Sequence, residues 1–190
     1  MTAFIDLPDQ DAFRLRNATV PACLIDNPPP AATTDEDGLT RLDIAVTGGR
    51  IHEVSPANSA PGSDTDIDLN DSLVWPCFAD VHTHIDKGQI WPRQRNPDGT
   101  RGGALSSTEA DRNANWSADD LRTRMNFSLE CAWSHGTAAL RTHIDSTPPQ
   151  HKITWPVVSE IRDAWAGRIA VQAVCLEPIW GYADKGFGNE

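Results

Sequence analysis

Two histidines, His82 and His84, stand one residue apart after a short apolar run that begins at Val74. Successive side chains of a β-strand point to opposite faces, so a spacing of two directs both imidazoles to the same side. Neutral imidazole is a common ligand of zinc and iron, and its ordinary pKa of about 6.5 permits coordination at cellular pH. The pair therefore predicts half of a metal site. Two surface histidines at a strand end are the alternative interpretation.

The residues around the pair favour the metal site. Val74, Phe78 and Val81 predict a short buried strand that carries the histidines at its C-terminal end, where barrel enzymes hold their catalytic groups. Asp86 follows His84 by two and would face the same side if the strand continued. It would then orient a ligand or a bound substrate, whereas a turn-forming aspartate is the alternative.

The segment after the histidines alternates between helical and strand-like patterns. Gln94 to Ala114 is polar and rich in glycine, which predicts a long loop that forms a lid or a substrate wall, or is disordered. Ser117 predicts the N-cap of a helix that stops near Gly136. A strand over 138–144, a helix over 153–165 and a strand over 169–176 follow. This alternation predicts parallel units in an α/β sheet or barrel.

Polar side chains also alternate along the second of these strands. Arg141, His143 and Asp145 fall on one face, which points inward in a barrel and must be hydrogen-bonded or line a pocket. We expect pocket-lining or ligand-orienting roles for them rather than direct metal contact. Trp91 and Trp180 follow strand ends and are the tryptophans placed to stack on a planar ring.

Residues 1–73 are expected to form a small β domain without a catalytic group, followed by a second domain over 74–190. The first domain shows short β-like runs over 13–20, 42–46 and 50–54, and Gly48-Gly49 between the last two is typical of a tight hairpin. The stretch from Pro28 to Gly38 predicts a surface loop.

The bulk composition, 39% hydrophobic and 23% charged, is that of a soluble globular protein. A formal net charge of -11 argues against nucleic-acid or anionic membrane partners. No run approaches the ~20 apolar residues of a membrane span, and acidic residues interrupt the first twenty positions, so we expect a cytoplasmic protein. The four cysteines are widely scattered, which predicts reduced and mostly buried thiols.

Four segments together resemble a known family: Ile44–Ile51, Trp75–Lys87, His135-Gly136 and Leu140–Asp145. They are similar to the amidohydrolase superfamily in its cytosine-deaminase-like branch. The resemblance implies a metal-dependent TIM-like (β/α)8 barrel preceded by a small β-sandwich-like domain, with His82 and His84 holding one divalent Fe or Zn ion. The family's remaining ligands, two histidines and an aspartate on later strands, have no counterpart here. Residues 74–190 are therefore expected to form about three strands of an incomplete barrel.

The same resemblance implies a hydrolase of carbon–nitrogen bonds other than peptide bonds, which deaminates a small nitrogen heterocycle by attack of a metal-activated hydroxide. The catalytic residues remain unknown and are expected outside this sequence, so the chain alone is expected to be inactive. Glu177 stands where cytosine-type relatives carry a glutamine, which argues against cytosine itself. Glu177 would pair with a more cationic ring, or be an ordinary exposed carboxylate.

Two other classes fit the sequence less well. The small zinc nucleoside and base deaminases need His-x-Glu and Pro-Cys-x-x-Cys, and the sequence contains neither motif. A non-catalytic fragment or association module is the remaining alternative. In that case an exposed sheet edge would pair with a second copy or with a missing C-terminal half.

Overall fold

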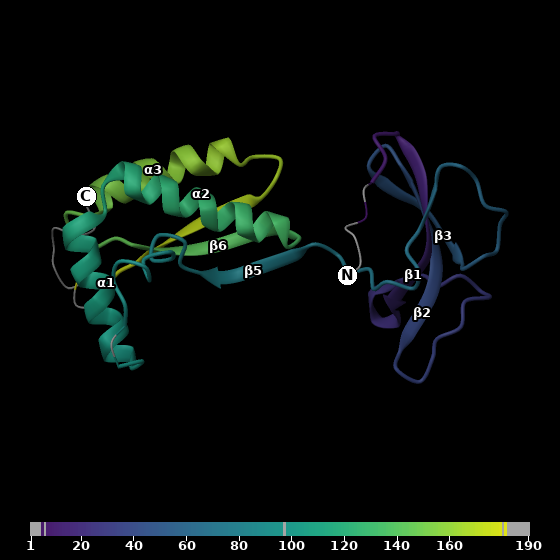
Figure 1. Cartoon of the computed structure of the whole chain (residues 1–190), viewed down its shortest axis with the longest axis horizontal. Helices are drawn as coiled ribbons and strands as arrows, with labels where there is room; N and C mark the ends of the chain where they lie inside the picture. Colours follow the sequence, from purple (N-terminus) through teal and green to yellow (C-terminus); the bar gives the residue numbers. More distant parts are fainter. Residues whose placement is uncertain (1–4, 6, 97, 180, 182–190) are drawn as a thin grey trace. The chain divides into compact units, whose positions relative to one another are not determined.

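The structure is a computed structural model that describes residue 5 and residues 7–96, 98–179 and 181. The chain divides into two compact units, Met1–Pro76 and Cys77–Glu190 (Figure 1). Each unit has its own sheet and its own apolar core.

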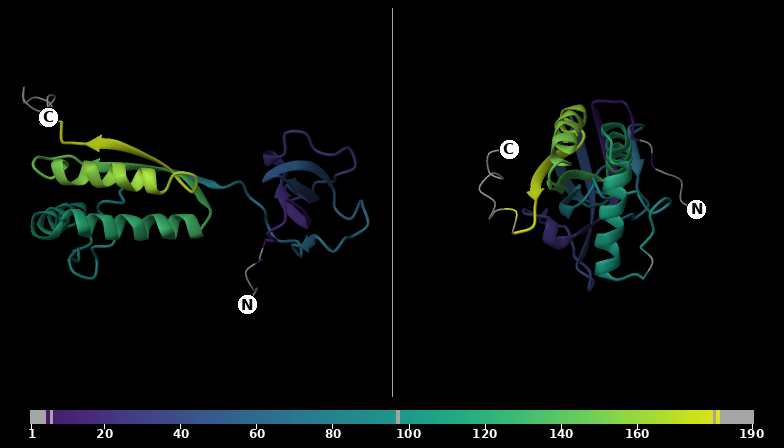
Figure 2. Two further views of the ribbon diagram at one scale, coloured as in Figure 1. Left: turned by 90° about the horizontal axis from the view of Figure 1, so that it is seen from above. Right: turned by 90° about the vertical axis from the view of Figure 1, so that its left-hand side faces the viewer.

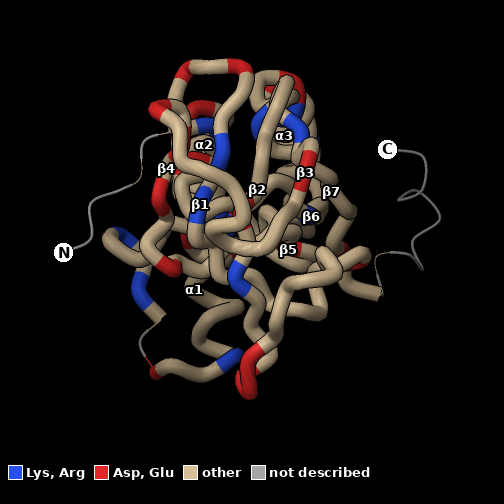
Figure 3. Tube along the Cα trace, turned by 90° about the vertical axis from the view of Figure 1, so that its right-hand side faces the viewer, with Lys and Arg blue, Asp and Glu red and all other residues tan. Residues whose placement is uncertain are grey.

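The first unit is built on one four-stranded sheet with the order β3-β2-β1-β4. Its strands are β1 (Ala12–Pro21), β2 (Leu39–Thr47), β3 (Arg50–Pro56) and β4 (Asp66–Asp68), and a short 3-10 turn, Ala22–Leu24, follows β1. β1, β2 and β3 pair antiparallel, and β4 runs parallel to β1. Acidic and basic positions are interspersed along these strands and their loops (Figure 3). The β-sandwich-like domain expected here is thus a single mixed sheet in the part of the chain that the structure describes.

The hairpin between β2 and β3 turns at the glycine pair, as predicted. Gly48 and Gly49 have φ angles of 59° and 69°, the left-handed values that both central residues of a type I′ turn require. A side chain at either position would strain the backbone, which explains why two glycines stand here.

The core of the first unit is formed by apolar residues of β1, β2 and the turn after β4, and Val74 packs against it. The Val74 amide donates to the Thr19 carbonyl at 2.9 Å, which ties this residue to β1. The prediction that Val74 belongs to the histidine-bearing strand is therefore wrong. That strand begins only at Phe78, after Pro76, whose nitrogen carries no hydrogen for a sheet.

The second unit contains a parallel sheet with the order β5-β6-β7. The strands are β5 (Phe78–Thr83), β6 (Thr137–Asp145) and β7 (Ala170–Leu176). The helices are α1 (Arg101–Asn115), α2 (Ala118–Ser134) and α3 (His151–Ala164), and α2 and α3 lie side by side on one face of the sheet (Figures 1 and 2). Sequential parallel strands with helices on one face are the arrangement of consecutive βα units, as predicted for α/β alternation.

α2 follows the predicted pattern closely. The Ser117 hydroxyl caps its N-terminus by accepting a hydrogen bond from the Asp120 amide at 3.2 Å. Leu121, Met125 and Leu129 recur at helical spacing and are fully buried in the core that α2 shares with β6 and α3. This apolar stripe is the main contact that fixes the helix layer on the sheet.

The prediction of a long loop over 94–114 is wrong, because α1 occupies most of it. Thr100 caps the helix, its hydroxyl accepting a hydrogen bond from the Gly103 amide at 3.0 Å. The residues that α1 buries are Ser107 and Asp111, both polar. The helix therefore shows no apolar periodicity in the sequence, although it is anchored by hydrogen bonds.

Burial of the first parallel strand was also predicted wrongly. Phe78 and Val81 are 55% and 71% exposed. β5 is an edge strand, and the described helices pack mainly against β6 and β7, so the faces of β5 are left uncovered. The expected burial of the thiols fails as well: Cys23, Cys77 and Cys175 are exposed and Cys131 is partly exposed, and none forms a disulfide.

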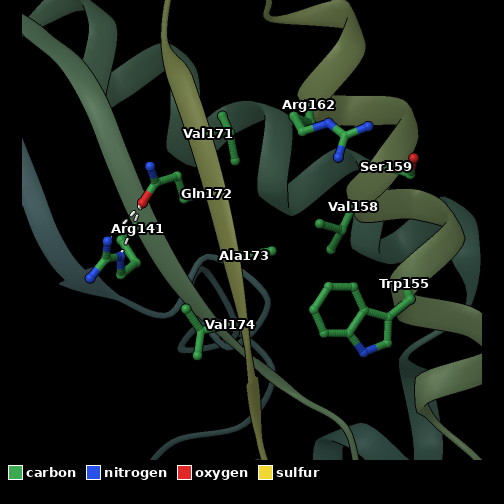
Figure 4. A pocket seen from close by; sticks show the side chains of 9 residues that line it. All are labelled: Arg141, Trp155, Val158, Ser159, Arg162, Val171, Gln172, Ala173 and Val174. Atoms are coloured by element: carbon green, nitrogen blue, oxygen red, sulfur yellow. Dashed lines mark hydrogen bonds between the residues drawn. The ribbon is translucent and has the colours of Figure 1, made fainter.

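β7 forms the other edge of this sheet, beside a groove of about 550 Å³ that lies between it and α3 (Figure 4). Val158, Val171 and Trp155 give the groove an apolar lining. From the neighbouring strand β6, the Arg141 guanidinium donates to the Gln172 side-chain oxygen at 2.9 and 3.1 Å.

None of the helices in the described part of the chain has the length and the apolar character that a membrane-spanning helix needs.

Candidate active site at the ends of the parallel strands

Three imidazole rings gather where β5 and β6 end. The rings of His82 and His143 are stacked, with centroids 4.1 Å apart and planes inclined by 24°. The His84 ring lies 5.4 Å from that of His82 and 5.7 Å from that of His143. The structure thus brings the His82–His84 pair together and adds His143 from the neighbouring strand.

A backbone contact fixes the orientation of the His84 ring. Its Nδ1 lies 2.8 Å from the carbonyl oxygen of His143, and because a carbonyl can only accept, Nδ1 must carry the proton. The lone pair is then on Nε2, which is the tautomer that a histidine ligand of a metal adopts when its other nitrogen donates to the protein.

The surroundings of His143 disfavour its charged form. Burial lowers the pKa of His143, and the neighbouring His82 and His84 lower it further, while the Thr83 backbone opposes the shift. Its Nδ1 is buried and has no hydrogen-bond partner among the described residues. The His143 ring stacked on His82 limits the rotation of that side chain.

The donor set of these residues fits half of a mononuclear metal centre. His82 and His84 offer two imidazole nitrogens, whereas zinc sites use about four ligands. Within the described residues, no group of three or more His, Cys, Asp or Glu side chains is placed to hold an ion. The pair therefore matches the expected ligand chemistry but not the full ligand number.

Asp86 joins the end of β5 to the end of β6. β5 stops at Thr83, so the strand alternation does not reach Asp86, whose fully buried carboxylate accepts a hydrogen bond from the Asp145 amide at 2.8 Å. Burial raises the pKa of Asp86 to about 6, and the nearby Asp145 carboxylate adds to the rise, while the Asp145 amide and Lys87 oppose it. The side chain therefore holds two strand ends together.

Asp145 is neutralised by two cations. Its carboxylate oxygens lie 2.7 Å from Lys87 Nζ and 3.1 Å from Arg112 Nη1. Arg112 comes from α1 and was not predicted, because the sequence did not reveal that helix.

Glu177 follows the end of β7. It accepts a hydrogen bond from the Thr147 hydroxyl at 3.1 Å, and it is half-buried rather than an exposed carboxylate.

A partly buried ionic network ties the segment after β5 to the helices. Arg93 makes a bidentate contact with Asp111 at 2.7 and 2.8 Å and also contacts Asp120. Arg124 binds Asp120 at 2.9 Å and donates to the carbonyl oxygens of Asp86 and Gly88. These contacts fix the backbone that follows the histidines. Sequence reasoning missed the contacts of Arg93, because ion pairs between distant elements leave no local pattern.

Trp91 lies in this segment and is 59% exposed. The Arg95 guanidinium lies over its ring, 6.0 Å from the ring centroid. The second tryptophan considered for ring stacking, Trp180, is outside the described residues.

The chain is similar to a curated deaminase and to several solved structures. No family model matches the chain. The chain is 47% identical over 185 residues to a pterin deaminase of Rhizobium rhizogenes (strain K84 / ATCC BAA-868), in an alignment that covers 97% of this chain and 42% of that protein. The chain is therefore similar to a deaminase over nearly its whole length, as the resemblance to the cytosine-deaminase-like branch of the amidohydrolase superfamily predicts. The chain spans less than half the length of this curated relative.

Solved structures share the fold of this chain. A 5-methylcytosine deaminase from Klebsiella pneumoniae matches with a TM-score of 0.65 and 21% identity, over 86% of this chain and 36% of that chain. N-isopropylammelide isopropylaminohydrolase from Burkholderia multivorans ATCC 17616 matches with a TM-score of 0.61 and 23% identity, over 88% of this chain and 38% of that chain. Identities this low support the fold alone.

Proposed function

We propose that this chain supplies the first strands and the first two metal ligands of a hydrolase that removes an amino group from a small, planar nitrogen heterocycle. The observation that carries the proposal is the His82–His84 pair at the strand ends, with the His84 proton directed to a backbone carbonyl so that Nε2 is open for coordination. The 47% identity to a pterin deaminase over nearly the whole chain supports the reaction class.

His82 and His84 would hold one divalent ion, Fe or Zn. When bound, such an ion supplies Lewis-acid activation of water. The described residues prepare the ligands: the His143 carbonyl orients His84, the His143 ring supports His82, and Asp86 keeps β5 and β6 together. Lys87 and Arg112 pair with Asp145, so the negative charge of this carboxylate is compensated within the chain.

A pterin-type ring is the first substrate to test, because the curated relative acts on pterin according to its name. Glu177 supports a ring other than cytosine, since a carboxylate accepts hydrogen bonds but cannot donate them as a glutamine amide does. The half-buried Glu177 already receives one hydrogen bond from Thr147, which holds its carboxylate just after the end of β7. His143 and Asp145 would orient ligands or line the substrate space.

The two histidines are not expected to support catalysis without further ligands. Two nitrogen donors give weak zinc binding, and the described residues place no third ligand beside them. The groups that would move a proton to the leaving nitrogen are expected outside this sequence, as the resemblance implies. Residues 1–190 are therefore proposed to bind metal weakly and to release no ammonia.

The experiment measures zinc bound to purified residues 1–190 by equilibrium dialysis, together with ammonia release from pterin and from cytosine. We expect weak, saturable zinc binding that His82→Ala and His84→Ala abolish. His52→Ala is the matched control, because His52 is an exposed histidine on β3 of the other unit. Unchanged zinc binding by the His82 and His84 variants would refute the ligand assignment, and measurable turnover would refute the proposed inactivity.

Association through the open sheet is the second candidate function, and the apolar groove along the β7 edge favours it. An unpaired parallel edge beside an apolar groove is a surface onto which another strand can add. Light scattering after gel filtration tests it: Val174→Lys on β7 should reduce any concentration-dependent mass increase. A strictly monomeric chain at all concentrations would contradict this candidate.

A further inference from the structure

We propose that Thr142 is a positioning residue for the metal ligand His84, on which it acts through the backbone amide of Ile85. The Ile85 amide donates to the Thr142 hydroxyl at 3.1 Å, and this hydrogen bond is buried. Ile85 directly follows His84, and Thr142 directly precedes His143, whose carbonyl receives the His84 ring. The inference rests on the proposed function, because it concerns how one of the two proposed ligands is held.

The hydrogen bond lies just beyond the last paired position of β5. β5 and β6 run side by side in parallel, and their pairing ends with Thr83 opposite Thr142 (Figure 1). The pairing is already irregular before this point, because the register shifts between Asp80 and Thr83. His84 follows the end of the strand, so other contacts must hold the backbone that carries it.

Three hydrogen bonds, each between one side chain and one backbone group, continue the link to β6 after the strand pairing ends. They join His84 to His143 at 2.8 Å, Ile85 to Thr142 at 3.1 Å and Asp86 to Asp145 at 2.8 Å. In the first and the third bond, the segment after β5 contributes a side chain. In the middle bond it contributes its backbone, so the Thr142 hydroxyl is the group of β6 that holds the main chain of this segment.

The residue type at position 142 fits this role. Thr142 and Ile144 lie on the same face of β6, and both are fully buried. Ile144 packs in the core with residues of α2 and α3. Valine has the shape of threonine and would fill position 142 without burying a hydroxyl, which is costly unless it is hydrogen-bonded. The buried hydroxyl therefore needs a specific partner, and the Ile85 amide is that partner.

Loss of the hydroxyl would move the backbone next to His84. Ile85 is 4% exposed, and a buried amide that loses its acceptor costs its full desolvation penalty. The chain at Ile85 would then shift until the amide finds another acceptor. The hydrogen bond from the adjacent His84 to the His143 carbonyl is 2.8 Å long, and hydrogen bonds weaken steeply when their geometry is distorted.

Release of the ring would alter His84 as a ligand. The His143 carbonyl keeps the proton on Nδ1 of His84 and the lone pair on Nε2. Without this acceptor, either ring nitrogen can carry the proton, and the ring can turn away from His82. Removing a group that orients a metal ligand in this way weakens metal binding by about 10–100-fold.

The first measurement needs no metal and uses NMR of the imidazole nitrogens in residues 1–190. In the unsubstituted chain, the nitrogen shifts of His84 should report one tautomer, with the proton on Nδ1. Thr142→Val keeps the shape of the side chain and removes the hydroxyl, so it should move these shifts toward a mixture of tautomers. Thr142→Ser retains the hydroxyl and should give the single tautomer again.

Thr154→Val is the matched control for the loss of a buried hydroxyl. Thr154 is fully buried in α3, and its hydroxyl accepts a hydrogen bond from the Gln150 side chain at 3.1 Å. Both valine variants therefore lose one buried hydrogen bond of the second unit, and a general loss of stability would affect both. The nitrogen shifts of His84 should change in Thr142→Val alone.

The second measurement is zinc binding by equilibrium dialysis. We expect Thr142→Val to weaken zinc binding about tenfold, whereas Thr142→Ser and Thr154→Val should bind zinc as the unsubstituted chain does. Equal, measurable zinc affinities of the two valine variants would overturn the proposal. A Thr142→Ser variant that resembles Thr142→Val in both measurements would also overturn it, because the methyl group and not the hydroxyl would then be responsible.

Two further results would overturn the proposal: His84 nitrogen shifts in Thr142→Val that match those of the unsubstituted chain, or rapid hydrogen exchange at the Ile85 amide of the unsubstituted chain. The exchange measurement needs no variant, so it decides the matter even if circular dichroism shows that Thr142→Val does not fold. The proposed function fails separately. If His82→Ala leaves zinc binding unchanged, the ligand assignment is lost, while the His84 shifts still decide the role of Thr142.

Discussion

Asp111 provides the sharpest test of how the segment after β5 is held. Its fully buried carboxylate accepts two hydrogen bonds from Arg93, one from the Trp116 indole at 2.8 Å and one from the Asn115 amide at 2.8 Å. Asp111→Asn keeps the size of the side chain but removes the negative charge and one acceptor oxygen. Arg93 then loses half of its bidentate contact and retains Asp120 as its anion.

The expected cost follows from the burial of the two partners. Breaking a buried ion pair by removing one partner costs about 3–5 kcal/mol. Arg93 is 36% exposed and keeps its contact with Asp120, so water and that carboxylate compensate part of the loss. We therefore expect Asp111→Asn to lower the free energy of unfolding of the second unit by about 2–3 kcal/mol at pH 7.

The pH dependence gives a second, independent signature. Burial alone would raise the pKa of Asp111, but hydrogen bonds from Arg93, Trp116 and Asn115 outweigh it and the pKa is lowered. A carboxyl group with a lowered folded-state pKa stabilises the fold above its unfolded value of about 3.9, and this stabilisation is lost as the pH falls toward the folded value. The difference between the unsubstituted chain and Asp111→Asn should therefore shrink as the pH falls below about 4.

Urea unfolding monitored by circular dichroism measures both effects. The control is Glu160→Gln, which breaks an exposed ion pair with Arg122 at 2.8 Å and should change stability by less than about 0.5 kcal/mol. The reasoning is refuted if the two variants unfold at the same urea concentration, or if the Asp111→Asn difference is as large at pH 3 as at pH 7.

Three further changes test the cores and the turn. Leu129→Ala should cost about 3–4 kcal/mol in urea unfolding, because Leu129 is fully buried and its loss leaves a cavity. Gly49→Val should destabilise the first unit by about 1–2 kcal/mol, since φ at this position is 69°, and thermal unfolding would reveal it. Asp43→Ala should cost about 1–3 kcal/mol and speed hydrogen exchange at Asn17 and Asn58, whose amides donate to the buried Asp43 carboxylate at 3.0 and 3.1 Å.

The sequence predicted those elements whose apolar residues repeat at a regular period. α2 was predicted from the Ser117 N-cap and the stop near Gly136, and its acidic first turn and buried stripe agree with that prediction. α1 was missed because its buried face consists of Ser107 and Asp111, so the helix carries no apolar period. A helix anchored by hydrogen bonds and ion pairs looks like a polar loop in a single sequence.

The sequence predicted the part of the candidate site that depends on local alternation along one strand. The alternation of side chains along a strand was enough to group His82 with His84, whereas the stacking of His143 on His82 also needed the pairing of β5 with β6. The interpretation of Asp86 on a continued strand does not apply, because β5 ends three residues earlier and Asp86 lies in a turn, as the alternative interpretation has it. Its bond to the Asp145 amide depends on the pairing of two strands that are far apart in the sequence.

The polar network pairs the charged groups that lie near the strand ends. Buried carboxylates are costly unless they are paired, and Asp111 and Asp120 are paired with Arg93 and Arg124, of which Arg124 also fixes backbone carbonyls after His84. The contacts of Arg124 with the carbonyl oxygens of Asp86 and Gly88 hold the backbone that follows His84. Loosening the network should therefore disturb this backbone segment first.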